Sequence, residues 1–121
     1  MSDGVKIYHN PRCSKSRDTL SLLKSNGIEP EVVLYLDTPP DAATLRELIS
    51  QLGFASARDL MRQKEDLYSS LNLSDRSLTE EALITAMIEN PKLIERPVVV
   101  AHGQARIGRP PERVLEILTA S

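Results

Sequence analysis

Cysteine is almost missing from this 121-residue sequence, and its scarcity excludes several kinds of protein. A single cysteine, Cys13, allows neither an internal disulfide nor a zinc site built from several cysteines. No apolar run approaches the length of an export signal or of a membrane span. The net charge of −2 gives no reason to expect nucleic acid or an anionic membrane as a partner. An unpaired thiol without an export signal predicts a protein of the reducing cytoplasm.

Internal repeats and low-complexity tracts are also missing. The length predicts one domain spanning residues 1–121, large enough to bury a hydrophobic core without disulfides or structural metal ions. Hydrophobic residues make up 40% and charged residues 26% of the chain, which is ordinary for a globular protein.

The one cysteine lies between two predicted elements. The alternating apolar run around Val5 and Ile7 predicts a strand, and Asn10-Pro11 predicts the turn that ends it. A helical leucine pattern follows and ends at Gly27. Cys13 therefore lies in the loop that leads into the amino terminus of a helix.

This placement favours a reactive thiolate. Unpaired backbone N–H groups and the positive end of the helix dipole stabilise an anion there. Arg12, Lys15 and Arg17 add positive charge, so we expect the pKa of Cys13 to be lowered. The alternative is a buried apolar filler, but such a cysteine belongs on the periodic face of an element, whereas this one lies between Arg12 and Ser14.

The order of the remaining elements predicts the fold. A strand at 31–35 completes a strand–helix–strand unit, whose two strands should be parallel. Residues 41–94 are predicted to be helical. A strand at 97–100, a return strand at 105–108 and a last helix opened by Pro110-Pro111 follow. We predict an α/β protein with a thioredoxin-like core, a mixed four-stranded sheet and a helical insertion after the second strand.

Three arginines stand at junctions between predicted elements. Arg62 ends a short helix that Ser56 caps, Arg96 precedes Pro97 and a buried strand, and Arg109 precedes the last helix. A guanidinium offers paired planar donors suited to tetrahedral oxyanions, although each arginine taken singly also fits a solvated surface charge. Arg96-Pro97 is in addition a candidate cis peptide bond beside the cysteine loop.

Two more side chains stand near Cys13 in the sequence. His9 could favour the thiolate by its charge or by a hydrogen bond, or it could satisfy loop backbone groups instead. Ser16 completes a C-x-x-S pattern; it cannot resolve a disulfide, but it could donate a hydrogen bond to Cys13 or cap the helix.

Five segments together resemble the ArsC family of glutathione- and glutaredoxin-dependent arsenate reductases, and within it the YfgD-like branch. They run in the family's order from about Val5 to Leu118: residues 7–17, 34–40, 60–62, 95–100 and 108–110. The resemblance implies a thioredoxin-like core with a helical insertion.

The resemblance also implies a role for each candidate residue. Cys13 matches the cysteine that attacks arsenate, and Arg62, Arg96 and Arg109 match the arginines that bind the oxyanion. His9, Ser16 and Pro97 match supporting positions. Arg12, Ser14 and Lys15 depart from the pattern of the well-studied reductases, and the extra charge beside the nucleophile bears on the choice of oxyanion.

One cysteine also bears on the reaction. It cannot complete a two-electron reduction through an internal disulfide, so the implied mechanism ends with external thiols, glutathione first and glutaredoxin second. The implied chemistry needs neither a metal nor a tightly bound cofactor. Two alternatives stay open: a non-enzymatic regulatory module like the Spx proteins, and a reductase of another substrate.

Overall fold

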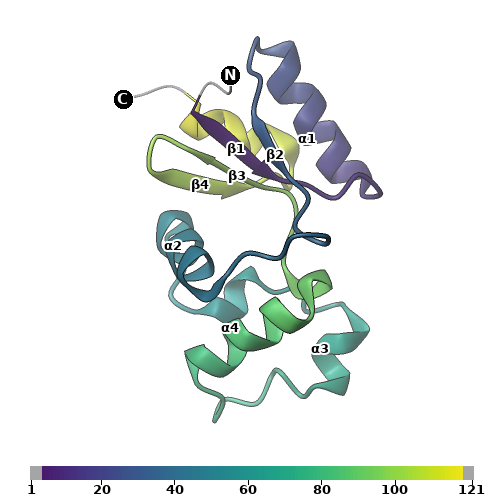
Figure 1. Cartoon of the computed structure of the whole chain (residues 1–121), viewed down its shortest axis with the longest axis vertical. Coiled ribbons are helices and arrows are strands. Elements are labelled where there is room, and N and C mark those ends of the chain that lie inside the picture. Colours follow the sequence, from purple (N-terminus) through teal and green to yellow (C-terminus); the bar gives the residue numbers. More distant parts are fainter. Residues whose placement is uncertain (1–3, 119–121) are drawn as a thin grey trace. The chain divides into compact units, whose positions relative to one another are not determined.

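Residues 4–118, which the computed structural model describes, form two compact units (Figure 1). The first unit extends to Thr38 and resumes at Arg96, and the second comprises Pro39–Glu95. The second unit thus interrupts the first after its second strand, where the sequence predicts the helical insertion. The organisation of residues 1–121 as a single domain stays a prediction.

The first unit contains a four-stranded mixed sheet, as predicted. Its strands lie in the order β2 (Glu31–Val33), β1 (Val5–Tyr8), β3 (Val98–Ala101) and β4 (Gln104–Ile107). β1 runs parallel to β2 and antiparallel to β3, and β3 and β4 form an antiparallel hairpin. β3 is therefore an interior strand, and the strand predicted at 97–100 is observed one residue later, at Val98–Ala101.

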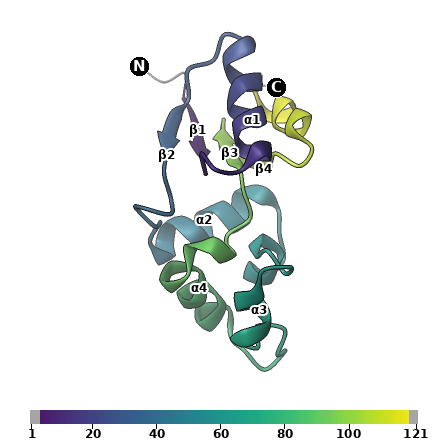
Figure 2. The ribbon, with the colours of Figure 1, turned by 90° about the vertical axis from the view of Figure 1, so that its right-hand side faces the viewer.

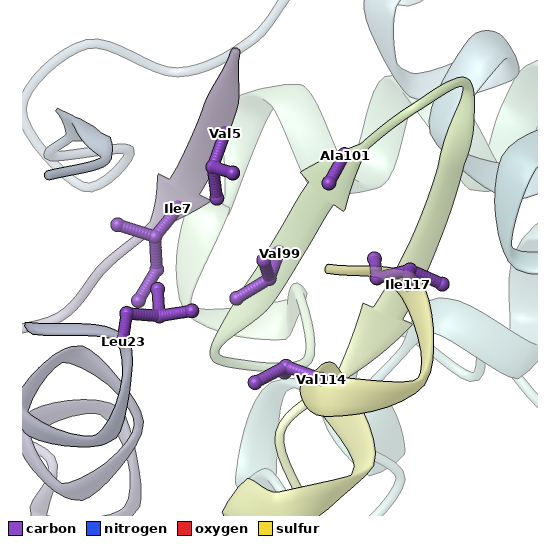
Figure 3. Packing of buried hydrophobic residues seen from close by; sticks show 7 residues of the cluster. All are labelled: Val5, Ile7, Leu23, Val99, Ala101, Val114 and Ile117. Atoms are coloured by element: carbon purple, nitrogen blue, oxygen red, sulfur yellow. The ribbon is translucent and has the colours of Figure 1, made fainter. Parts of the chain in front are cut away.

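Two helices cover one face of this sheet. Val5 and Ile7 of β1 stand opposite Ala101 and Val99 of β3, so alternate side chains share a face. Leu23 of α1 (Ser14–Ser25) and two residues of the 3₁₀ helix η3 (Pro111–Ile117) bury that face, and Figure 3 shows the resulting cluster: Val5, Ile7, Leu23, Val99, Ala101, Val114 and Ile117. Figure 2 shows α1 and η3, the latter in yellow, on the same side of the sheet.

The sheet register brings four loops to one end of the sheet. Tyr8, the last residue of β1, stands opposite Val33 at the end of β2 and Val98 at the start of β3. Val98 in turn stands opposite Ile107 at the end of β4. The segments beginning at residues 9, 34 and 108, and the segment ending at residue 97, therefore emerge together.

A glycine allows two of these segments to approach closely. A Cβ atom on Gly108 would lie 2.5 Å from Thr19 Oγ1 and 2.9 Å from Pro97 Cγ, so no larger residue fits without displacing its neighbours. Gly108 thus packs against Thr19 of α1, and the next residue, Arg109, reaches Cys13 at the start of that helix.

In the first unit, the second strand and the last helix differ from their predicted forms. The strand predicted at 31–35 ends at Val33, because the Leu34 carbonyl accepts hydrogen bonds from Asp37 and Thr38 and so closes a turn. Tyr35 is consequently buried in that turn. The predicted last helix forms with 3₁₀ geometry, and Pro111 occupies its first position, where the missing N–H leaves no bond unmade.

The second unit is helical. Its elements are α2 (Ala42–Leu52), η1 (Ala57–Leu60), α3 (Asp66–Ser70), α4 (Glu80–Glu89) and η2 (Pro91–Leu93). Asp41, Ser56 and Thr79 cap α2, η1 and α4 by accepting backbone N–H groups, and the cap at Ser56 is the one predicted above. Across residues 4–118, no helix combines the length and the apolar character needed to cross a bilayer.

Candidate active site

Cys13 occupies the N-cap position of α1. Its N–H donates to the Asn10 carbonyl at 3.0 Å, and its carbonyl accepts the Arg17 N–H at 3.0 Å. The Asn10 side chain accepts the Arg12 N–H at 3.0 Å and so closes the turn. The backbone thus holds the partly exposed thiol at the start of the helix.

The surroundings of the sulfur favour the thiolate. Partial burial is the largest single influence and raises the pKa of Cys13, but several smaller influences together outweigh it. They are the Ser16 N–H, a hydrogen bond from the Arg96 side chain, the Lys15 N–H and the charge of Arg96, so the pKa of Cys13 is lowered from its ordinary value.

The main cationic influence on Cys13 comes from Arg96, which is distant in the sequence. Arg12, Lys15 and Arg17 are exposed to water, which screens their charges, and the lowered pKa of Cys13 comes from the helix N–H groups and Arg96. The helix position of Cys13 and its lowered pKa agree with the sequence argument, while a contribution from the charges of Arg12, Lys15 and Arg17 stays a prediction.

Two of the three candidate arginines lie at the sulfur. Arg109 Nη2 donates to Cys13 Sγ at 3.7 Å, and Arg109 Nε donates to the Arg96 carbonyl at 2.8 Å. The Arg96 side chain also donates a hydrogen bond to the Cys13 sulfur. Its buried Nε–H has no hydrogen-bond acceptor among the described residues. The predicted cis bond at Arg96-Pro97 is confirmed, and Arg109-Pro110 is cis as well.

Arg62 belongs to the second unit, and its convergence on Cys13 stays a prediction. It does not end a helix as the sequence suggested, because η1 stops at Leu60 and Met61 pairs with Ile94. Its guanidinium forms ion pairs with Glu65 at 3.3 Å and Glu95 at 3.6 Å. Two carboxylates therefore compensate the charge of Arg62.

His9 and Ser16 form a buried pair behind the cysteine loop. Ser16 Oγ lies 2.6 Å from His9 Nδ1 and accepts the Asn10 N–H at 3.0 Å. Burial, followed by the charge of Lys24, lowers the pKa of His9, so the imidazole is neutral at pH 7.

These contacts decide between the interpretations of His9 and Ser16. A neutral imidazole does not favour the thiolate by charge, and the Ser16 hydroxyl neither caps α1 nor bonds to Cys13. Since the hydroxyl accepts from Asn10, we assign its proton to the bond with His9 Nδ1. The pair supports the loop that holds Cys13.

Tyr35 is a site residue that the sequence argument missed. It is fully buried, and its hydroxyl interacts with Arg96 and helps to keep that guanidinium charged, although burial is the larger influence and opposes the charge. The sequence argument assigned residues 31–35 to a strand and gave Tyr35 no role at the site. A polar aromatic residue at the end of a short edge strand was the available signal.

The thiolate can be tested by the rate of Cys13 alkylation with iodoacetamide as a function of pH. Because the pKa of Cys13 is lowered, we expect the midpoint of this pH profile to fall below about 8.5, the pKa of free cysteine. Below the midpoint the thiol is protonated and reacts slowly. In Arg96→Ala the midpoint should move up, since that variant loses both a hydrogen bond and a charge. A wild-type midpoint at or above that of free cysteine would contradict the assignment.

Comparison with known proteins places the chain in a family. The model of the ArsC family matches residues 8–117. The chain belongs to the ArsC family. A Neisseria meningitidis protein named arsenate reductase is 53% identical over 114 residues, which cover 94% of this chain and 97% of that protein. The Escherichia coli protein named uncharacterized protein YfgD is 75% identical over 118 residues, covering 98% and 99%.

A solved structure agrees with the observed fold. The arsenate reductase from Vibrio cholerae is 60% identical, has a TM-score of 0.93 and covers 94% of this chain and 97% of its own. The ArsC fold is thus the fold of this chain. Between residues 4 and 118, no group of three or more histidine, cysteine or acidic side chains is arranged to hold a metal ion.

Proposed function

We propose that this protein reduces arsenate to arsenite, with Cys13 as the nucleophile and external thiols as the source of electrons. One observation carries the proposal: the Cys13 sulfur accepts a hydrogen bond from Arg109 and another from Arg96 at the start of α1. These donors favour the thiolate and suit an oxyanion bound beside it. Membership of the ArsC family supports the same chemistry.

The first half of the reaction forms bonds without transferring electrons. The Cys13 thiolate attacks arsenic, an As–S bond replaces an As–O bond, and the departing hydroxide takes a proton and leaves as water. Glutathione then replaces a second hydroxyl in the same way. Arg96 and Arg109, together with Arg62 if it converges on them, neutralise the oxyanion throughout.

The second half transfers two electrons. A glutaredoxin thiolate attacks the glutathione sulfur on arsenic, the electrons of that As–S bond remain on arsenic as As(III), and a mixed disulfide leaves. Water then hydrolyses the Cys13–As(III) bond and returns the thiol and arsenite. In sum, two external thiols become one disulfide while As(V) becomes As(III), without a metal or a tightly bound cofactor. Because the reaction depends on reduced external thiols, we propose the reducing cytoplasm as its compartment.

Measuring arsenite produced from arsenate tests this proposal. We expect product with the protein, glutathione and glutaredoxin together, and a rate near the uncatalysed background when either thiol component is omitted. Background arsenite in the complete mixture would overturn the proposal. Product without glutaredoxin would retain arsenate reduction but overturn the proposed source of electrons.

A further inference from the structure

A groove lies next to Cys13 on the side of strand β2. It has a volume of about 370 Å³, within the range of about 300–1,000 Å³ typical of small-molecule sites. Residues 9–12 form one wall, and Leu34, Leu36 and Asp37 form the other. Both walls belong to loops that leave the same end of the sheet.

The groove and the two arginines at Cys13 involve different residues. Neither Arg96 nor Arg109 lines the groove. The groove wall nevertheless reaches the residue before the nucleophile, and Asn10 of that wall accepts the Cys13 N–H. Two different surfaces therefore lie near the thiol. Arg96 and Arg109 suit an oxyanion, and the groove suits a second molecule.

The lining of the groove combines one charge of each sign with apolar surface. Arg12 and Asp37 are exposed, and neither side chain has an ion-pair partner among the described residues. Leu34 is 40% exposed and supplies apolar surface to the groove. A flexible zwitterion with a carboxylate at one end, an ammonium at the other and methylene groups between them would complement this lining.

We propose that this groove binds the first thiol co-substrate as a small zwitterionic thiol peptide of the glutathione type, with a carboxylate at Arg12 and its ammonium at Asp37. The inference rests on the proposed function, which requires an external thiol beside the Cys13 adduct. The bound thiol bonds to arsenic and displaces one hydroxyl, which leaves with the thiol proton as water. Arsenic remains As(V) in this step.

A non-reactive probe tests binding separately from catalysis. S-methylglutathione carries the same charges as glutathione but no thiol, so we expect its titration to shift the backbone amide NMR signals of residues 9–12 and 34–37. If millimolar S-methylglutathione shifts only the signals of other residues, or none, the groove is not the binding site, whether or not arsenite is formed. Shifts at the groove without arsenite formation would leave the groove standing and defeat the proposed function.

Variants test the two charges. Arg12→Gln with Asp37→Asn should raise the KM for glutathione roughly three- to tenfold, since two exposed ion pairs are lost, and should leave the KM for arsenate unchanged. The rate with 2-mercaptoethanol, which has no charges, should also be unchanged. The matched control is Glu112→Gln with Arg113→Gln, two exposed residues of η3 outside the groove. An equal rise in both KM values, or an unaltered KM for glutathione, would overturn the assignment.

Discussion

Replacing Cys13 by serine is expected to lower arsenite formation by roughly three orders of magnitude or more, as removal of a covalent nucleophile does in other enzymes. A serine hydroxyl is not ionised near neutral pH, and it forms no As–S bond. The Ser16 and Lys15 N–H groups and Arg96, which stabilise the Cys13 thiolate, would then have no anion to stabilise. Initial rates of arsenite formation with both external thiols at saturation measure the loss.

The serine variant should fold as well as the wild type, which makes this result interpretable. Position 13 is the N-cap of α1, and serine is among the preferred N-cap residues. Circular dichroism and the thermal midpoint of unfolding provide the control. Arsenite formation at the wild-type rate by a correctly folded Cys13→Ser protein would exclude Cys13 as the nucleophile.

The second large effect concerns the arginines at the sulfur. We expect arsenate or sulfate to protect Cys13 competitively against alkylation, and Arg96→Ala or Arg109→Ala to weaken that protection by roughly one to two orders of magnitude. The reason is that a hydrogen bond to a charged group contributes about 1.5–3 kcal/mol. Lysine at position 109 should recover only part of the loss, because it keeps the charge but lacks the planar fork that reaches both Cys13 and the Arg96 carbonyl.

Arg62→Ala should weaken protection less than the other two variants. Glu65 and Glu95 already compensate the charge of Arg62, so its attraction for an oxyanion is smaller. The matched control is Arg113→Ala, which removes an exposed arginine of η3. In this variant the oxyanion should protect Cys13 as well as it does in the wild type.

The arginine experiment also separates an enzyme from a regulatory module. Binding of a partner protein does not require an oxyanion site at the cysteine. If arsenate or sulfate protects Cys13 as well in Arg96→Ala and Arg109→Ala as in the wild type, the two arginines have no part in oxyanion binding. The Spx-like alternative would then be favoured over the reductase.

Local signals explain why much of the first unit was predictable. Asn10-Pro11 ends a strand and Gly27 ends a helix through their own backbone preferences, so the placement of Cys13 between two elements follows from neighbouring residues. The caps at Asp41 and Thr79 are likewise local, as is the hairpin formed by β3 and β4. Residues 66–70 lack such a signal, so α3 was covered only by the general prediction that residues 41–94 are helical.

The sequence by itself determined that Cys13 opens a helix, that a mixed sheet lies beneath it, and that helices interrupt the chain after the second strand. Tertiary structure alone decided which charges reach the sulfur. Arg109 lies 96 positions from Cys13 and meets it because the β1–β3 and β3–β4 registers bring their loops to one end of the sheet and Gly108 lets the chain approach α1. Arg12, adjacent in sequence, is exposed to water instead, since proximity along the chain does not set side-chain burial.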